Sequence, residues 1–487
     1  MFERLCKNNN YGNLVNGDWV FSEKNIDIFS PTDGKLLGKI QSMTKKEIDN
    51  VLNLAKYAQK IWAEIPLNER ANILHKTAIL IEDNIDVLSN ILQNEIAKNK
   101  SSAESEVKRT AEFIKFTADA GKHLEGETID ADNFPGFNKN KISFVSRVPI
   151  GTVLAISPFN YPINLSASKI APALVGGNSV VLKPPTQGAI SALHLVELFE
   201  KAGLPKGVLN TVTGKSSEIG DYLVTHKHIN LINFTGSTNV GNHIAIIAGM
   251  VPMIMELGGK DAAIVLNDAD LDSTSKEIVS GAYSYSGQRC TAIKRVIVLN
   301  KVADELSEKI KQRVENLTVG TPQEDAIITP LINNSAADYV QELIDDAIEK
   351  GAKLLVGNKR FDNLFYPTLF DNVTENMRLA WEEPFGPVLP IIRVNTIDDA
   401  IRIANKSQYG LQSSVFTKNI DDAFYIANKL EVGTVQINNK TERGPDHFPF
   451  LGVKSSGMGT QGIRYSIEAM TRPKSIIVNY SPLTSLK

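Results

Sequence analysis

One cysteine in this chain stands where covalent chemistry is possible. Cys290 closes the stretch Tyr285-Ser286-Gly287-Gln288-Arg289-Cys290-Thr291 and is one of only two cysteines among 487 residues. A chain so sparing with thiols is not built on disulfides or cysteine-ligated metal, and a lone cysteine is more often a small buried hydrophobe. Here, however, the residues before the sulfur predict a turn with a fixed positive charge. Because cationic charge favours the nucleophilic thiolate, we expect Cys290 to be a nucleophile whose ionisation Arg289 or a bound cofactor assists.

Two further residues supply what a nucleophile needs to attack a carbonyl carbon. Glu256 lies in the apolar run Met253-Ile254-Met255-Glu256-Leu257. A carboxyl group in such a run is either ion-paired or has a raised pKa, and the latter suits a general base near neutral pH. Asn160 ends a predicted strand and offers an amide donor for an oxyanion. Nucleophile, base and oxyanion donor together predict acyl or carbonyl chemistry.

A β-α-β pattern that begins at Gly151 would position these side chains. Short apolar runs alternate with helical stretches, which predicts a parallel, doubly wound sheet. Ligands bind such sheets at the carboxyl ends of the strands, and here those ends carry unusual residues. The predicted strands cover 152–156, 179–182, 208–212 and 231–234, and they are followed by Ser157 to Asn160, Lys183 to Thr186, Thr213-Gly214 and Thr235 to Ser237.

Helices dominate the chain before this block, and a second α/β block follows it. Apolar residues at helical spacing, from Ile81 through Ile85, Leu88 and Leu92 to Ile96, predict one helix with a buried stripe. Another helix is expected over 102–122. Apolar runs at 262–266, 296–299 and 433–437 indicate the second block, and strands are expected at 141–148 and 475–480. The terminal strand needs a partner, either in another copy or within its own chain.

Composition and charge argue against several classes of function. A formal net charge of −3 is not typical of general nucleic-acid or membrane-surface binding. The first ten residues lack the apolar core of a secretory signal, and the longest apolar run, at 245–255, is too short to cross a bilayer, so we expect a cytoplasmic protein. The seven histidines show no metal-ligand spacing, and no metal is expected. The G-x-G-x-x-G pattern at 457–462 lacks a preceding strand and a complete βαβ unit, which predicts a loop.

Five motifs in series resemble the aldehyde dehydrogenase family, in the family's order and over nearly the whole chain. They are Phe159-Asn160, Phe234-Thr235-Gly236-Ser237, Glu256-Leu257-Gly258-Gly259-Lys260, Gly287-Gln288-Arg289-Cys290 and Glu383-Pro384-Phe385-Gly386-Pro387. More narrowly, the chain resembles the non-phosphorylating glyceraldehyde-3-phosphate dehydrogenases. The matches there are Ser157 through Pro162, Tyr285 through Arg295, and Asn438-Asn439-Lys440-Thr441-Glu442-Arg443-Gly444.

The resemblance implies an α/β fold with three parts. We expect a doubly wound parallel-sheet cofactor-binding domain, a second α/β catalytic domain and a small β element for oligomerisation. The expected ranges are 1–125 with 147–257, then 258–457, and 126–146 with 473–487, while residues 458–472 return along the cofactor-binding domain. Because the family forms dimers and tetramers, a homo-oligomer is expected, with a tetramer favoured over a dimer.

The resemblance also implies a reaction. Cys290 thiolate would add to an aldehyde, Asn160 and the backbone N–H of Cys290 would hold the oxyanion, and hydride would pass to a nicotinamide ring. Glu256 would then activate the water that hydrolyses the thioester. Glu383 would hold the nicotinamide ribose, and the pyrophosphate would lie at a helix N-terminus. The expected cofactor-binding residues are Ser157, Pro158, Phe159, Lys183, Thr186, Phe234, Gly236, Ser237, Gly241, Leu257, Glu383 and Phe385.

One departure from the family pattern predicts the cofactor. The family usually carries Lys-Pro-(Ala/Ser)-Glu after the second strand, and its glutamate would repel a 2′-phosphate. This chain has Lys183-Pro184-Pro185-Thr186, so Thr186 removes the negative charge while Lys183 supplies a cation. A charge difference at this range is worth about 1–4 kcal/mol. We therefore expect NADP, with NAD as the weaker alternative.

The expected substrate is a phosphorylated aldehyde, D-glyceraldehyde 3-phosphate, oxidised with water to 3-phosphoglycerate. Arginine suits phosphate because its planar fork makes paired hydrogen bonds. The residues that match the substrate side of the glyceraldehyde-3-phosphate enzymes are Arg109, Tyr161, Arg289, Thr291 and Arg443. The alternatives are another aldehyde dehydrogenase, for lactaldehyde or succinate semialdehyde, a cofactor-independent thiol esterase, and a non-catalytic scaffold with the same fold.

Overall fold

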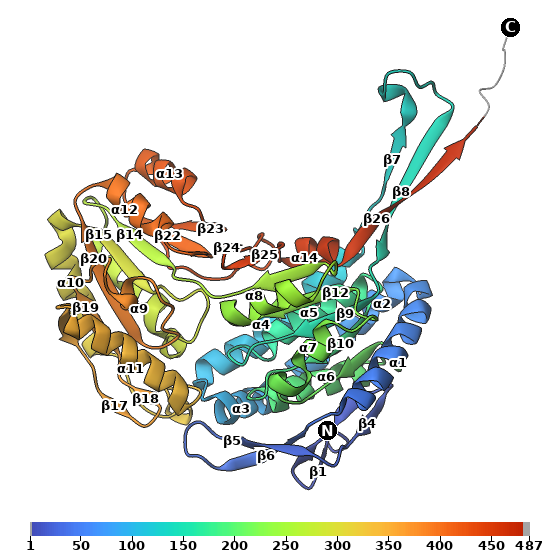
Figure 1. The fold of residues 1–487 in the computed structure, drawn as a ribbon, viewed down its shortest axis with the longest axis horizontal. Helices are drawn as coiled ribbons and strands as arrows, with labels where there is room; N and C mark the ends of the chain where they lie inside the picture. Colours follow the sequence, from blue (N-terminus) through green and yellow to red (C-terminus); the bar gives the residue numbers. More distant parts are fainter. Residues whose placement is uncertain (1, 481–487) are drawn as a thin grey trace.

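The structure, a computed structural model, describes residues 2–480 and consists of two α/β lobes and a projecting β arm (Figure 1). The first lobe is built on a six-stranded sheet with the order β11-β10-β9-β12-β13-β25. Its first five strands are parallel, and β25 is antiparallel to β13. They are β9 (Thr152–Ile156), β10 (Ser179–Lys183), β11 (Leu209–Thr211), β12 (Leu231–Thr235), β13 (Met253–Glu256) and β25 (Gly457–Met458).

This sheet confirms the predicted doubly wound pattern. The connecting helices are α5 (Asn164–Val175), α6 (Ala189–Lys201), α7 (Ser216–Val224) and α8 (Thr238–Ile247). The chain moves outward in one direction from β9 to β11 and then returns to place β12 on the other side of β9. The order therefore reverses between β9 and β12, and this switch point is where open α/β sheets bind ligands. Asn160 and Ser237 follow these two strands.

Four helices cover the chain ahead of this sheet, α1 (Lys45–Glu64), α2 (Leu67–Glu82), α3 (Ile85–Ile96) and α4 (Lys100–Gly121). The single helix predicted from Ile81 to Ile96 is wrong, because the chain breaks between α2 and α3. Asn84 leaves helical geometry, with φ −122° and ψ 23°, and its side-chain amide donates to the carbonyl oxygen of Leu80. Asparagine competes for backbone groups in this way, so the apolar stripe continues across two helices.

Residues 6–41 form strands that the sequence did not reveal. A four-stranded sheet contains β1 (Cys6–Lys7), β2 (Asn10–Tyr11), β5 (Asn25–Phe29) and β6 (Leu36–Gln41), and a separate hairpin pairs β3 (Asn13–Val15) with β4 (Asp18–Val20). These strands are short and carry many polar residues, so their alternation was too weak to read.

The second lobe contains a seven-stranded sheet in the order β16-β19-β20-β15-β14-β22-β23. Only the β16–β19 pair is antiparallel. The strands are β14 (Ala262–Val265), β15 (Arg295–Leu299), β16 (Lys353–Val356), β19 (Thr368–Asp371), β20 (Val388–Val394), β22 (Gln412–Phe416) and β23 (Thr434–Ile437). The helices of this lobe are α9 (Leu271–Tyr283), α10 (Asn300–Glu315), α11 (Asn334–Glu349), α12 (Ile397–Asn405) and α13 (Ile420–Lys429). Two short pairs, β17 (Arg360–Phe361) with β18 (Leu364–Phe365) and β21 (Tyr409–Gly410) with β24 (Val453–Lys454), complete the lobe.

The arm is a three-stranded sheet that projects from the body beside the first lobe (Figure 1). It has the order β26-β8-β7, with β7 (Glu127–Asp130), β8 (Lys141–Pro149) and β26 (Thr471–Asn479). The predicted terminal strand thus pairs within its own chain, from Thr471 opposite Pro149 to Asn479 opposite Lys141. Strand β26 still forms one edge of the sheet, and residues 481–487 of the expected oligomerisation element lie outside the described residues.

The G-x-G-x-x-G segment is a loop, as predicted, only from Gly459 to Gly462. Its first two residues form β25, which places Gly457 opposite Glu256, and α14 (Ile463–Ala469) follows Gly462. Gly457 has φ +149°, and a Cβ atom there would lie 2.1 Å from the carbonyl oxygen of Met255. The glycine is therefore required for close strand approach rather than for a dinucleotide. Within residues 2–480, no helix combines the length and apolar character that crossing a bilayer requires.

Candidate active site

A strained turn presents Cys290 between the two lobes' sheets. The turn η2 (Ser284–Gly287) follows α9, and three consecutive residues in it have positive φ: Tyr285 at 52°, Ser286 at 53° and Gly287 at 71°. The Tyr285 hydroxyl donates to the carbonyl oxygen of Ile96 at 3.0 Å, and the Ser286 hydroxyl donates to that of Thr329 at 2.8 Å. Such backbone geometry persists only where surrounding contacts enforce it, and it is concentrated at functional sites.

The sulfur of Cys290 lies beside the carboxyl group of Glu256. Sγ donates a hydrogen bond to Oε1 at 3.1 Å, so the residues expected to be the nucleophile and the base meet across the two lobes. Burial, followed by the negative charge of Glu256, raises the pKa of the Cys290 thiol well above its ordinary value. The expectation that Arg289 promotes ionisation is not met, because its guanidinium turns to the Ser284 hydroxyl and the carbonyl oxygens of Thr291 and Thr441.

Glu256 is held as an ion-paired carboxylate, the first of the two states expected for it. Its side chain is 2 % exposed, and Oε2 accepts from Arg443 Nη1 at 2.8 Å and from Gln461 Nε2 at 3.3 Å. Arg443 in turn donates to Gln461 Oε1 at 2.9 Å. The carboxylate is therefore fixed on one oxygen by a cation and an amide, while its other oxygen faces the thiol.

Asn160 and Tyr161 sit on a loop that a buried ion pair secures. Asn160 is 3 % exposed, and its Nδ2 donates to the carbonyl oxygen of Gln288 at 2.9 Å, which ties it to the cysteine turn. Lys98 forms an ion pair with Glu106, donates to the carbonyl oxygen of Asn160 at 2.7 Å, and lies 3.5 Å from the ring centroid of Tyr161. The oxygen Oε1 of Glu106 accepts the first N–H groups of the α5 region, from Ile163 and Asn164.

A cavity of about 560 Å³ extends from Cys290 along the carboxyl ends of β9, β10 and β12. It brings together the thiol, Asn160 and eleven of the twelve residues predicted to bind the cofactor, namely Ser157, Pro158, Phe159, Lys183, Thr186, Phe234, Gly236, Ser237, Leu257, Glu383 and Phe385. Gly241, the twelfth, packs against this wall, since a Cβ atom on it would lie 2.4 Å from Leu257 Cδ2. Burial lowers the pKa of Lys183 to about 8.

The cavity has one wall from each lobe. Phe159 from the first lobe and Phe385 from the second face each other edge to face, with ring centroids 5.9 Å apart. Ser237 caps the N-terminus of α8 on the first wall by accepting from the Val240 N–H. On the second wall, Glu383 forms an ion pair with Lys294 at 2.9 Å. A helix N-terminus and a carboxylate on opposite sides suit a phosphate and a ribose, so the lining fits a dinucleotide.

The residues predicted to contact substrate separate into two groups. Arg109 and Tyr161 line a second, polar cavity of about 230 Å³ with Ser101, Ser102 and Ser105. Asp446 joins two of the arginines, because it accepts a paired hydrogen bond from Arg109, at 2.8 and 2.9 Å, and lies 3.7 Å from Arg443 Nε. Arg289 and Thr291 are not among the residues that line these two cavities in the described chain. They contact each other and Thr441, and Arg289 also donates to the Ser284 hydroxyl.

Comparison with known proteins settles the family. The model of the Aldehyde dehydrogenase family matches residues 19–476. The chain belongs to this family. An NADP-dependent glyceraldehyde-3-phosphate dehydrogenase of Streptococcus equinus is 58 % identical over 467 residues, which are 96 % of this chain and 98 % of that protein. The enzyme of the same name from Arabidopsis thaliana is 48 % identical and covers 98 % of this chain and 97 % of its own.

A solved member of the aldehyde dehydrogenase family shares the fold closely. The crystal structure of NADP-dependent glyceraldehyde-3-phosphate dehydrogenase from Bacillus halodurans C-125 complexed with NADP has a TM-score of 0.96 and 54 % identity, and the match covers 97 % of this chain and 100 % of that one. The predicted family and fold are thus confirmed.

Sequence reasoning missed the residues that hold the site together. Lys98, Gln461, Lys294 and Asp446 bind backbone or side chains of the site, yet the sequence had assigned none of them a role. Lys98 lies two residues after Ile96, where the apolar stripe ends, and a lysine there is a weak sign of a buried charge. Gln461 and Lys294 fall inside motifs quoted above, but their partners Glu256 and Glu383 are distant in sequence, as is Arg109, the partner of Asp446.

Proposed function

We propose that this chain oxidises D-glyceraldehyde 3-phosphate to 3-phosphoglycerate, with NADP as the hydride acceptor and water as the acyl acceptor. The observation that carries the proposal is the contact of Cys290 with Glu256, 3.1 Å long, at the inner end of a dinucleotide-sized cavity. Similarity to relatives that carry this activity in their names supports the same substrate.

The chain's own residues would act in order on one carbonyl carbon. Glu256 accepts the proton of the Cys290 thiol, and the resulting thiolate forms a bond to the aldehyde carbon. Asn160 Nδ2 and the Cys290 N–H hold the oxygen that becomes negative. Loss of hydride restores the carbonyl as a Cys290 thioester. After Glu256 has released its first proton, it takes one from water, whose oxygen displaces the sulfur and frees the acid.

NADP, when bound, supplies the acceptor for the hydride, and eleven lining residues offer it a place. Lys183 and Thr186 follow β10 and are suited to the 2′-phosphate, since they provide a cation and a hydroxyl and no carboxylate. The N-terminus of α8 at Ser237 suits the pyrophosphate. Glu383 suits the nicotinamide ribose, because its carboxylate lies on the same wall as Cys290 and lines the same cavity.

The arginine pair joined by Asp446 would receive the phosphate of the substrate. Arg109 lines the polar cavity beside Tyr161, and Arg443 contacts the base Glu256. A phosphorylated aldehyde that reaches Cys290 can therefore place its anionic end toward these cations. Arg289 and Thr291, behind the cysteine turn, would support the loop at Thr441 that leads into Arg443.

A substrate panel tests the proposal. Initial rates of reduced-nicotinamide formation are measured with glyceraldehyde 3-phosphate, unphosphorylated glyceraldehyde, lactaldehyde and succinate semialdehyde, each with NADP and with NAD. We expect the highest kcat/KM for the phosphorylated aldehyde with NADP. Equal kcat/KM for glyceraldehyde with and without its phosphate would overturn the substrate assignment, and a clear preference for NAD would overturn the cofactor assignment.

We also propose a cytoplasmic homo-oligomer, with a tetramer favoured, in which the arm contributes to the subunit contact. On β26, Ile476 and Ile477 are 55 % and 56 % exposed, and the strand's edge is free. Exposed apolar side chains on an open strand edge favour pairing with another chain. In this proposal the ranges 1–125 and 147–257 bind the cofactor and 258–457 carries the nucleophile. Sedimentation of the full chain, compared with a variant bearing charged residues at positions 476 and 477, tests the contact.

A further inference from the structure

Lys294 is a buried cation placed between the nucleophile and Glu383. It lies directly before β15 and its side chain is 2 % exposed. The ammonium donates to the carbonyl oxygen of Cys290 and forms the 2.9 Å ion pair with Glu383 Oε1. Its backbone N–H is bound to the carbonyl oxygen of Asp261 at 2.9 Å. A buried ammonium is tolerated only with such partners, so its position is fixed at both ends.

The carboxylate that Lys294 holds is itself closely confined. Glu383 Oε1 also accepts the N–H of Gly259 at 3.1 Å. On the other side, Oε2 lies 2.4 Å from the position that a Cβ atom on Gly258 would take, so only glycine leaves room for it. Without Lys294, the Gly259 N–H would be the one hydrogen-bond donor left, among the described residues, to a carboxylate that lines the cofactor cavity.

We propose that Lys294 is a positioning residue for the proposed oxidation: its single ammonium group fixes Glu383 on the cofactor wall and carries the positive charge that favours the Cys290 thiolate. The first role rests on the proposed function, because it concerns the nicotinamide ribose. The second concerns the sulfur alone and holds for the protein without cofactor. Lys294 thus takes the part that we expected of Arg289 from the sequence.

The charges around the sulfur support this assignment. Glu256 on β13 and Glu383 on the second wall both raise the pKa of the Cys290 thiol, whereas Lys294 lowers it. Arg443 is engaged by Glu256 at 2.8 Å. The ionisable groups that surround Lys294 itself are Glu383, Asp261, Arg295 and Lys260. Of these, burial raises the pKa of Asp261 to about 7, and Lys294 opposes that rise.

Lys260 provides a matched control for the loss of a buried lysine. It is 2 % exposed and belongs to the same cluster, but its Nζ has no hydrogen-bond partner among the described residues. Burial, followed by the charges of Arg295 and Lys294, lowers the pKa of Lys260 well below its ordinary value. Lys260→Met therefore removes a similar volume, but no hydrogen bond to Cys290 or Glu383, unlike Lys294→Met.

The experiment measures the rate of iodoacetamide alkylation of Cys290 against pH in the full-length protein without cofactor. The background from Cys6 is removed with Cys6→Ser in every variant. We expect Lys294→Met to raise the apparent pKa of the thiol by about one unit, a tenfold slower alkylation at fixed pH below it. Lys260→Met should leave the profile in place. Glu383→Gln should shift it the opposite way, toward lower pH, which a merely structural defect would not produce.

A second variant separates charge from position. Lys294→Gln keeps a donor for the Cys290 carbonyl and Glu383 but carries no charge, so it should raise the thiol pKa while increasing the KM for NADP less than Lys294→Met does. It also replaces Lys294→Met should that variant not fold. If the pKa of the Cys290 thiol in both Lys294→Met and Lys294→Gln equals that in the Lys260→Met control, the proposal is wrong. Absence of glyceraldehyde 3-phosphate turnover in the unmodified protein would refute the proposed function and leave the alkylation result readable.

Discussion

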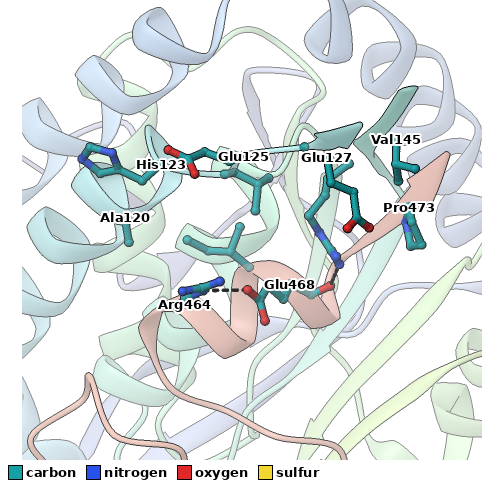
Figure 2. A pocket seen from close by; sticks show the side chains of 12 residues that line it. Ala120, His123, Glu125, Glu127, Val145, Arg464, Glu468 and Pro473 are labelled. Carbon is teal, nitrogen blue, oxygen red and sulfur yellow. Dashed lines mark hydrogen bonds and ion pairs between the residues drawn. The ribbon is translucent and has the colours of Figure 1, made fainter. Parts of the chain in front are cut away.

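Two cavities of nearly equal volume lie in different parts of the molecule and are lined by chemically different side chains. The cavity of about 560 Å³ at Cys290 follows the strand ends of the six-stranded sheet. The other, of about 540 Å³, lies at the root of the arm, between the end of α4, strands β7 and β8, and helix α14 (Figure 2). Size alone therefore gives no reason to prefer one as the reaction site.

The side chains of the arm cavity are occupied with each other. Arg464 forms an ion pair with Glu468 at 2.7 Å (Figure 2). Arg147 donates to the backbone carbonyl oxygen of Glu468 and, outside the lining, to the Thr471 hydroxyl at 2.8 Å. None of its 12 lining residues in the described chain is a cysteine or a serine. At Cys290, by contrast, a nucleophile, a carboxylate and an amide converge from three elements. A functional site is distinguished by converging reactive groups rather than by the space around them.

The largest effect should come from removing the base. Glu256→Gln keeps the shape and the acceptor oxygen but cannot take a proton from water, so the thioester should accumulate. We expect steady-state turnover to fall about 10²- to 10⁴-fold. Stopped-flow absorbance should still record one equivalent of NADPH per subunit before the reaction stalls, formed more slowly because the Cys290 thiol has lost its proton acceptor. Steady turnover near that of the unmodified protein would show that Glu256 is not the base.

The role of Thr186 in selecting NADP, at the far end of the same cavity, is tested by Thr186→Glu. A carboxylate there should repel a 2′-phosphate and accept hydrogen bonds from a ribose. The interaction is worth about 1–4 kcal/mol, so the ratio of kcat/KM for NADP to that for NAD should fall about 5- to 1000-fold. Thr186→Gln, which has the same shape without the charge, is the control. An unchanged ratio in Thr186→Glu would remove this position from cofactor selection.

The pH dependence of cofactor binding should show whether the positive charge of Lys183 attracts the 2′-phosphate of NADP. Its pKa, lowered to about 8 by burial, means that the cation is present at pH 7 and is lost as the pH rises above 8. Because only the protonated form attracts a phosphate, the KM for NADP should rise about tenfold per pH unit above pH 8, and the KM for NAD should not. Lys183→Met should abolish the difference in slope. Parallel profiles for the two cofactors would contradict this role.

The smallest effect is expected in the arm cavity. Arg464→Ala breaks the exposed ion pair with Glu468, and because such pairs contribute little, kcat/KM should stay within about twofold of the unmodified value. Steady-state rates of both proteins at the same concentration provide the measurement. A loss as large as that of Glu256→Gln would mean that the arm cavity, too, belongs to the reaction.

The parts of the molecule that could be predicted from the sequence were predictable for a shared physical reason. Strands β9 and β12 are short, mostly apolar runs between polar turns, so their limits could be read almost residue by residue. The strands before Gln41 are short and largely polar, and they have no such contrast. The nucleophile, base and amide could be found because their residue types are chemically unusual where they stand.

The arrangement of charge around the site could not be found in the same way. The direction of the Arg289 side chain depends on Ser284 and on the carbonyl oxygen of Thr441, and the role of Lys294 depends on Glu383. These partners come from separate elements that only the folded chain brings together. A positive charge next to a cysteine in sequence therefore did not identify the positive charge next to it in space.

The most direct test of the account is to look for the acyl group on the sulfur. Glyceraldehyde 3-phosphate and NADP are mixed with the protein, the reaction is quenched in acid within its first turnover, and peptides are mapped by mass spectrometry. We expect a 3-phosphoglyceroyl thioester on Cys290 of the unmodified protein. The Cys290→Ser variant should form neither this adduct nor NADPH. Undiminished, aldehyde-dependent NADPH production by Cys290→Ser would contradict the account.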